Sequence, residues 1–283
     1  MPLAYLPSPS RSVWHLGSVP LRLQALCVIA GILLALWIAD RRYRAGGGER
    51  GVIADVAAWA VPAGLIPAAL GAILASAHTG PWQAVRTWDA VIGFPGAAAF
   101  GTLAAWLACR RLRGTRGQRV RLGQVAGAAV PAVAFGQAMV AIGEWFAQQG
   151  YGRPSAAWWS VKISPAHRLQ GYENFATFQP IFLYQALWDV AVGVALIWAA
   201  RRFGMPGMRL FALGAAAYAA GGFGLFWLGI GHLPVILGLR AGELGDAVVF
   251  AVAVVYLIRT RRMRPTPLQN AQKPALESDT PVM

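Results

Sequence analysis

The chain has 283 residues, of which 57% are hydrophobic and only 13% are charged, and its mean hydropathy is +0.50. This is more apolar sequence than a soluble core of this size would bury, so the composition predicts a polytopic membrane protein. The net charge of +14 lies in short basic runs beside apolar segments, where such charges set membrane orientation. The charge therefore argues against nucleic-acid binding.

The two cysteines, Cys27 and Cys109, both lie inside apolar runs. Their positions predict neither a disulfide framework nor a metal cluster, and we expect no metal and no cofactor. No cleavable signal peptide is evident, because residues 1–20 are rich in proline and contain Arg11 as their one strong base.

Seven apolar segments predict an all-α fold with seven transmembrane helices. They span roughly residues 19–39, 53–77, 88–109, 122–146, 180–200, 210–230 and 244–258. The first, third, fifth and seventh segments end in arginine clusters, whereas the other three do not. Because Lys and Arg are in excess on cytoplasmic loops, this pattern predicts an external N-terminus and a cytoplasmic C-terminus.

A long external loop, residues 145–178, is predicted between the fourth and fifth helices, and it is long enough to carry interfacial helices. The fourth segment enters it through Gly- and aromatic-rich sequence without a basic stop. Backbone that leaves a helix there must be screened by protein or face water, which favours a site at the membrane surface; a plain helix end is the alternative. We expect residues 1–262 to form the membrane domain and residues 263–283 to form a disordered cytoplasmic tail.

A set of short motifs runs through most of the chain, and together they resemble one known family. The motifs are Val13-Trp14-His15-Leu16-Gly17, Trp59-Ala60-Val61-Pro62-Ala63-Gly64, Tyr151-Gly152-Arg153-Pro154, Tyr172-Glu173-Asn174-Phe175, Phe182-Leu183-Tyr184 and Gly238-Leu239-Arg240. In combination they resemble the phosphatidylglycerol:prolipoprotein diacylglyceryl transferases of bacterial inner membranes. Each motif alone would be weak.

The resemblance implies a multi-pass protein of the bacterial cytoplasmic (inner) membrane. The family transfers diacylglyceryl from phosphatidylglycerol to the lipobox cysteine thiol of a prolipoprotein and releases glycerol phosphate. The implied partners are phosphatidylglycerol or another anionic phospholipid, with prolipoproteins or an active family paralogue. This chemistry needs cations that stabilise the departing phosphate and a polar group that activates the thiol. Arginine suits the first task because its fork matches phosphate oxygens.

The sequence departs from the family pattern at several of its charged and hydrogen-bonding positions. The two family arginines correspond to Ala141 and Gly222. The other positions that differ are Glu144, Ala147, Gln149, Gln179, Gln185 and Phe226, with Ala69, Gly71 and Ala72 replacing a cluster in the second segment. Losing one charged hydrogen bond to a transition-state oxygen costs about 2.7–4 kcal/mol. We therefore interpret the chain as a divergent member and a pseudoenzyme, with impaired or no standard transferase activity.

Five residues remain as candidates for a phospholipid-binding site: Arg153, Arg240, Tyr184, Glu144 and Gln179. Either arginine could bind a lipid phosphate, or could simply extend from a helix end to the headgroups. Tyr184 could instead be an interfacial anchor. Glu144 is expected to pair with Arg153, the alternative being a solvated interfacial acid.

No catalytic residue is assigned. His167, with Glu173 nearby, is an alternative acid–base group, although a lone loop histidine is more often structural. Asp189 is expected to cap or pair inside the bundle. Glu243 and Asp246 are explained by a favourable interaction with the dipole of the seventh helix.

Three functions follow as hypotheses. The chain is a non-catalytic relative that binds phospholipid or prolipoprotein or assists a true transferase, or it is an active transferase in which Arg153 or Arg240 has taken over the phosphate. A small-molecule transporter ranks last, because intramembrane charges are few and no inverted repeat is evident.

Overall fold

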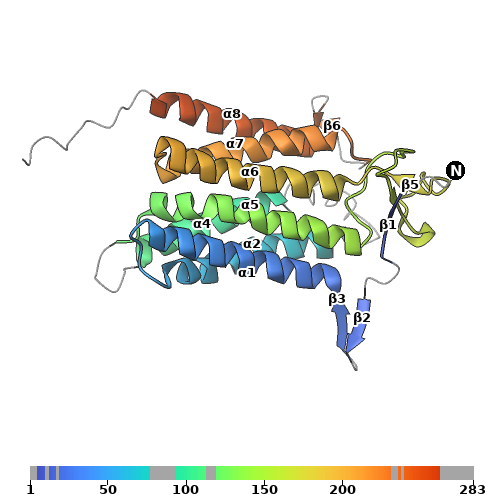
Figure 1. Cartoon of the computed structure of the whole chain (residues 1–283), viewed down its shortest axis with the longest axis horizontal. Coiled ribbons are helices and arrows are strands. Elements are labelled where there is room, and N and C mark those ends of the chain that lie inside the picture. Colours follow the sequence, from blue (N-terminus) through green and yellow to red (C-terminus); the bar gives the residue numbers. More distant parts are fainter. Residues whose placement is uncertain are drawn as a thin grey trace, which may run out of the picture.

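In the computed structural model, the described part of the chain contains seven long helices that lie side by side in a bundle, and short strands gather near one end of it (Figure 1). The structure describes residues 5–9, 13–16, 19–76, 94–112, 119–230, 235–236 and 239–261. The predicted tail, residues 263–283, lies outside the described residues.

The helices are α1 (Leu23–Ala45), α2 (Val52–Ser76), α4 (Phe94–Arg111), α5 (Leu122–Phe146), α6 (Ile181–Phe203), α7 (Gly207–Phe226) and α8 (Ala241–Arg261). The predicted bounds of α5 are confirmed. The predicted start of the first helix at residue 19 is wrong, because β3 (Val19–Arg22) pairs with β2 (Val13–Leu16) in an antiparallel hairpin before α1 begins.

Four of the described helices are long and apolar enough to cross a membrane: α1, α5, α6 and residues Gly207–Leu225 of α7. Large side chains on the outside of the bundle fit this reading. Trp37 on α1 and Trp198 on α6 are 59% and 58% exposed, which is costly in water and favourable in lipid. The described helices thus agree with a membrane protein. The seven membrane crossings and the membrane side on which each terminus lies stay predictions.

Helix α5 is the central element, since it packs against α1, α6 and α7. Its contact with α1 depends on two glycines that face each other. A Cβ atom at Gly31 would lie 2.6 Å from the Gly136 carbonyl oxygen, and a Cβ at Gly136 would lie 2.9 Å from the Gly31 carbonyl oxygen. The two backbones can approach this closely only because neither residue has a side chain.

The segment between α5 and α6 has a small hydrophobic core of its own. Strand β4 (Val161–Lys162) pairs antiparallel with β5 (Thr177–Phe178) and parallel with β1 (Leu6–Pro7). Val161 and Phe178 of these strands and the adjacent Ile163 are buried, and they pack in one cluster with Phe182 of α6 and Ile230. Instead of the interfacial helices expected here, the segment contains one 3₁₀ turn, Pro165–His167. The all-α prediction therefore holds for the bundle but not for the segment outside it.

Gln148 fixes the start of this segment. The residue is buried and adopts a left-handed backbone conformation, with φ of 54°. Its side-chain Nε2 donates to the Pro9 carbonyl (3.1 Å), and its Oε1 accepts from the Ser164 amide (2.8 Å). One side chain thereby joins the N-terminal segment, the end of α5 and the loop.

We expect Gly31→Leu to destabilise the protein by about 1–3 kcal/mol, because the new side chain would separate α1 from α5. The matched control is Ala30→Leu, which adds the same side chain at the neighbouring exposed position. Thermal unfolding in detergent measures the difference. Equal unfolding temperatures for the two variants would contradict the close α1–α5 contact.

We expect Gln148→Ala to loosen the segment after α5, because two buried hydrogen bonds are lost and their partners stay unpaired. Limited proteolysis between residues 147 and 180 should become faster by about tenfold, since cleavage follows the population of the open form. Gln149→Ala is the control, as Gln149 is exposed and accepts one long bond from Gln24 (3.3 Å). If both variants are cleaved at the same rate, Gln148 does not hold the segment in place.

Candidate functional site

The motif around Arg153 is held by backbone hydrogen bonds to two helix ends. The Arg153 amide donates to the Leu228 carbonyl just after α7, and the Gln179 amide just before α6 donates to the Arg153 carbonyl, both at 3.0 Å. The Gly152 amide also donates to the Gln179 carbonyl (2.8 Å). The backbone of Arg153 is therefore fixed, while its side chain is exposed.

Tyr184, in the first turn of α6, lies at the same junction of loop and bundle. Its hydroxyl accepts a 2.7 Å hydrogen bond from the indole Nε1 of Trp159 in the loop. Tyr184 and Gln179 are both half-buried. Of the five predicted site residues, Arg153, Gln179 and Tyr184 thus meet where the loop joins α6.

Tyr151 supports this junction from the loop side. Its hydroxyl donates to the His167 carbonyl (2.6 Å) and accepts from the Leu169 amide (2.9 Å). Burial raises the pKa of Tyr151, an effect that the Leu169 hydrogen bond and the charge of Arg168 partly oppose. The hydroxyl keeps its proton at neutral pH and remains a donor.

The alternative acid–base residues, His167 and Glu173, do not contact each other in the described structure. The His167 ring Nδ1 lies 2.8 Å from the Ser164 hydroxyl. The Glu173 carboxylate accepts from the Gly171 amide (2.9 and 3.0 Å), and this bond lowers the pKa of Glu173. Both residues are exposed and serve the local loop structure.

Glu144 lies in the last turn of α5, and the predicted pair with Arg153 is wrong: no ion pair joins the two in the described structure. The Glu144 carboxylate instead lies against Gly150, whose φ is +62° and at which any Cβ atom would collide with the carboxylate. The left-handed turn after α5 thus folds back over the acid and separates it from the arginine.

Glu144 belongs to a group of polar residues that lies among α5, α6, α7 and α8. At its centre is Tyr218, whose hydroxyl is hydrogen-bonded to the side chain of Gln137. Three carboxylates interact electrostatically with this tyrosine: Glu144, Asp189 and Asp246. We call these three the acidic cluster.

Asp189 is the most deeply buried member, with 1% of its surface exposed. Its Oδ1 accepts from the Gln185 Nε2 one turn earlier (3.0 Å), which confirms that it pairs inside the bundle. Its Oδ2 is buried and has no hydrogen-bond partner. A buried oxygen of this kind is costly and marks a position that packing alone does not explain.

The two positions aligned above with family arginines differ in their surroundings. Ala141 is buried against Ala138 and Ala186, so a long side chain would force α5 and α6 apart. A Cβ atom at Gly222 would lie 2.5 Å from Oδ2 of Asp246. Asp246 therefore does more than interact with a helix dipole, because it occupies the space next to Gly222.

Sequence reasoning missed Gln137 and Tyr218. One signal was present: Gln137 and Glu144 are seven residues apart on α5 and thus share a helix face. Arg240 ends β7 (Leu239–Arg240), which pairs with β6 (Val235–Ile236) directly before α8. The side chains of Arg240, Ala69, Gly71 and Ala72 lie outside the described part of the structure.

The charges define what this region can do. Among the described residues, none of the three acids of the cluster forms an ion pair. The described residues also contain no group of His, Cys, Asp and Glu side chains that could hold a metal ion. Without a cation, this region offers no group that would stabilise a departing phosphate. Arg153 is the one predicted site residue with a positive side chain in the described structure. It is exposed and lies where the loop joins the helix bundle, which we call the rim.

Comparison with known proteins identifies the family. The model of the prolipoprotein diacylglyceryl transferase family matches residues 11–259. Two relatives from Streptomyces coelicolor, named phosphatidylglycerol–prolipoprotein diacylglyceryl transferase 2 and 1, are 42% and 40% identical; each match covers 94% of this chain, and 84% and 76% of the relative. A relative of the same kind from Streptomyces griseus is 39% identical over 94% of this chain and 80% of its own length. The match over nearly the whole chain shows that this protein belongs to the prolipoprotein diacylglyceryl transferase family.

Proposed function

We propose that this protein is a non-catalytic member of the family that binds an anionic phospholipid at the external surface of the bacterial inner membrane. In this role it handles phosphatidylglycerol or prolipoproteins, or assists an active paralogue, without transferring the diacylglyceryl group. It is a pseudoenzyme built on a lipid-handling scaffold.

The observation that carries this proposal is what surrounds Ala141 and Gly222. The reaction releases glycerol phosphate, and the departing anion needs positive groups near it. Here Ala141 has no space for a guanidinium, and Gly222 faces the Asp246 carboxylate. Each missing cation costs about 2.7–4 kcal/mol in the transition state, although effects within one site need not add. The nearby carboxyl groups supply no replacement cation.

Lipid binding without transfer is supported by the position of Arg153. Its backbone is fixed by Leu228 and Gln179, and its exposed side chain is free to reach a headgroup phosphate. Tyr184 and Gln179 can supply hydrogen bonds from the same junction. A phosphate held at this rim would keep the lipid ester away from the acidic cluster.

An active transferase with relocated arginines is the second candidate. The names of relatives up to 42% identical to this chain favour it. In that case Arg153 or Arg240 would stabilise the leaving phosphate from outside the helix bundle. The two candidates differ in whether a thioether forms.

We expect the protein not to rescue a bacterial strain depleted of its own transferase. Mass spectrometry of a reporter lipoprotein should find no diacylglyceryl thioether on the lipobox cysteine. The Streptomyces coelicolor relative that is 42% identical, expressed from the same vector, is the positive control. Membrane fractionation verifies insertion of both proteins. Rescue together with a lipidated cysteine would establish the active transferase.

We expect Arg153→Gln to weaken binding of a fluorescent phosphatidylglycerol analogue by about tenfold, because a charged hydrogen bond to phosphate is lost. Lys162→Gln is the matched control, since it removes one exposed charge from the same loop. A phosphatidylcholine analogue reports the part of binding that does not depend on net charge. Equal affinities of the two variants would show that Arg153 does not hold the headgroup.

A further inference from the structure

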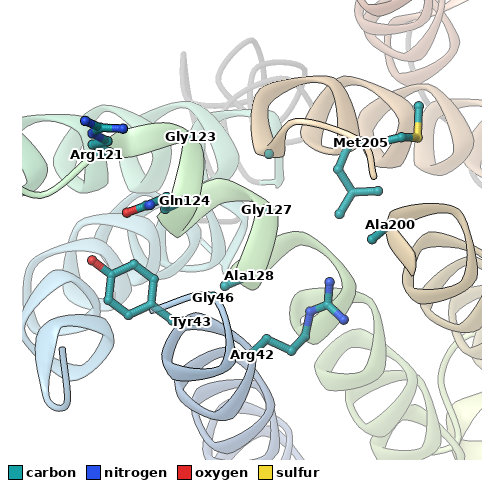
Figure 2. A pocket seen from close by; sticks show the side chains of 12 residues that line it. Arg42, Tyr43, Gly46, Arg121, Gly123, Gln124, Gly127, Ala128, Ala200 and Met205 are labelled. Atoms are coloured by element: carbon teal, nitrogen blue, oxygen red, sulfur yellow. The ribbon is translucent and has the colours of Figure 1, made fainter. Parts of the chain in front are cut away.

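A second polar region lies at the opposite end of the bundle, where α1 and α6 end and α5 and α7 begin. A pocket of about 510 Å³ opens between these helices, in the range of small-ligand sites. Its polar lining comes from Arg42, Tyr43, Arg121 and Gln124, and glycines supply much of the rest (Figure 2). The arginine clusters at this end predict that it faces the cytoplasm.

Arg42 differs from its neighbours on the last turns of α1. The Arg41 guanidinium lies over the Trp37 ring at 5.7 Å, and Arg44 forms an ion pair with Asp40 at 2.8 Å. Arg42 has neither arrangement: its Nε is buried without a hydrogen-bond partner. Figure 2 shows this side chain reaching from α1 toward the space between Ala128 and Ala200.

The positive charge of the pocket is not neutralised by its lining. None of the described residues that line it is an Asp or a Glu. Arg121 adds a second guanidinium, and Arg201 at the end of α6 is close enough to interact electrostatically with Arg42. Of the acids near this end of α1, Asp40 forms an ion pair with Arg44, and Glu49 interacts electrostatically with Tyr43 but does not line the pocket.

The helix ends around the pocket reinforce this charge. Neither α5 nor α7 has a side-chain N-cap, and Gly123 and Gly207 at these two helix starts line the pocket. Helix N-termini of this kind attract anions. The last carbonyls of α1 are already taken by the amides of Gly46 and the two residues after it, so they present little free acceptor surface.

We propose that this pocket binds the phosphate group of an anionic ligand, in which the Arg42 guanidinium contacts the phosphate oxygens and Arg121 adds positive charge at the edge of the pocket. Basic pockets between helices on the cytoplasmic side of a membrane protein are suited to anionic headgroups. The phosphate can belong to a phospholipid of the inner leaflet or to a soluble phosphate ester. This site is independent of the function proposed above, because it uses other residues at the other end of the bundle.

The test uses the full-length protein, delipidated in detergent, and hydrogen–deuterium exchange of residues 42–48 and 121–128. Phosphatidylglycerol should slow exchange in both stretches, whereas phosphatidylcholine should not. Glycerol 3-phosphate is added in a separate arm. Protection by phosphatidylglycerol alone assigns the site to a lipid headgroup, and equal protection by glycerol 3-phosphate assigns it to a soluble ester.

Arg42→Gln should lower the affinity for the ligand that slows exchange by about tenfold in a titration, because a charged hydrogen bond to phosphate is removed. Arg41→Gln is the matched control, because it removes a charge from the adjacent residue, whose guanidinium lies over the Trp37 ring. This variant should bind the ligand with the affinity of the unmodified chain. If Arg42→Gln unfolds, Arg121→Gln removes the other guanidinium that lines the pocket, from an exposed position, and should also weaken binding. Absence of protection by either phosphate ligand, or equal affinities of the folded pocket variant and Arg41→Gln, would overturn the proposal.

Discussion

Close packing of α5 through residues with little or no side chain is the constraint on which the rest of the structure depends. Gly136 lets α5 touch the backbone of α1, and Ala141 lets it pack against α6. A helix that is surrounded in this way has no space for a guanidinium at its inner face. The packing that makes α5 the centre of the bundle is thus incompatible with a family arginine at position 141.

The same arrangement determines the sign of the charge in the interior. Positions 141 on α5 and 222 on α7 hold no arginine; Tyr218 interacts electrostatically with three carboxyl groups, and one oxygen of Asp189 has no hydrogen-bond partner in the described structure. Charges in a low-dielectric interior act over several ångströms and are poorly screened. The described interior around Tyr218 thus contains carboxyl groups without an ion-pair partner, while exposed arginines lie at the two ends of the bundle.

The bundle itself could be predicted from the sequence to a useful degree. Apolar length and the arginine stops located most helices, and the bounds of α5 were correct. The start of α1 was not, because residues 19–22 are as apolar as a helix start, and only their pairing with β2 assigns them to a strand. Hydrophobicity gives the position of a segment but not its hydrogen-bond partner.

The site was harder to predict, for a physical reason. The positions of Ala141 and Gly222 could be read from motifs, but the neighbours that fill the space beside them depend on which helix faces meet. Asp246 is distant from Gly222 in sequence, and only the packing of α7 on α8 brings them together. The Glu144–Arg153 pair failed for a related reason, since the left-handed turn at Gly150 lies between two residues that are close in the chain.

The most direct measurement is the release of glycerol phosphate from phosphatidylglycerol liposomes by the purified protein in the presence of a lipobox peptide. With carboxylates where a departing phosphate needs cations, release should not exceed the rate without protein, while the Streptomyces coelicolor relative turns over under the same conditions. Peptide-dependent release by this chain, at a rate comparable to that of the relative, would contradict a negatively charged and inactive interior.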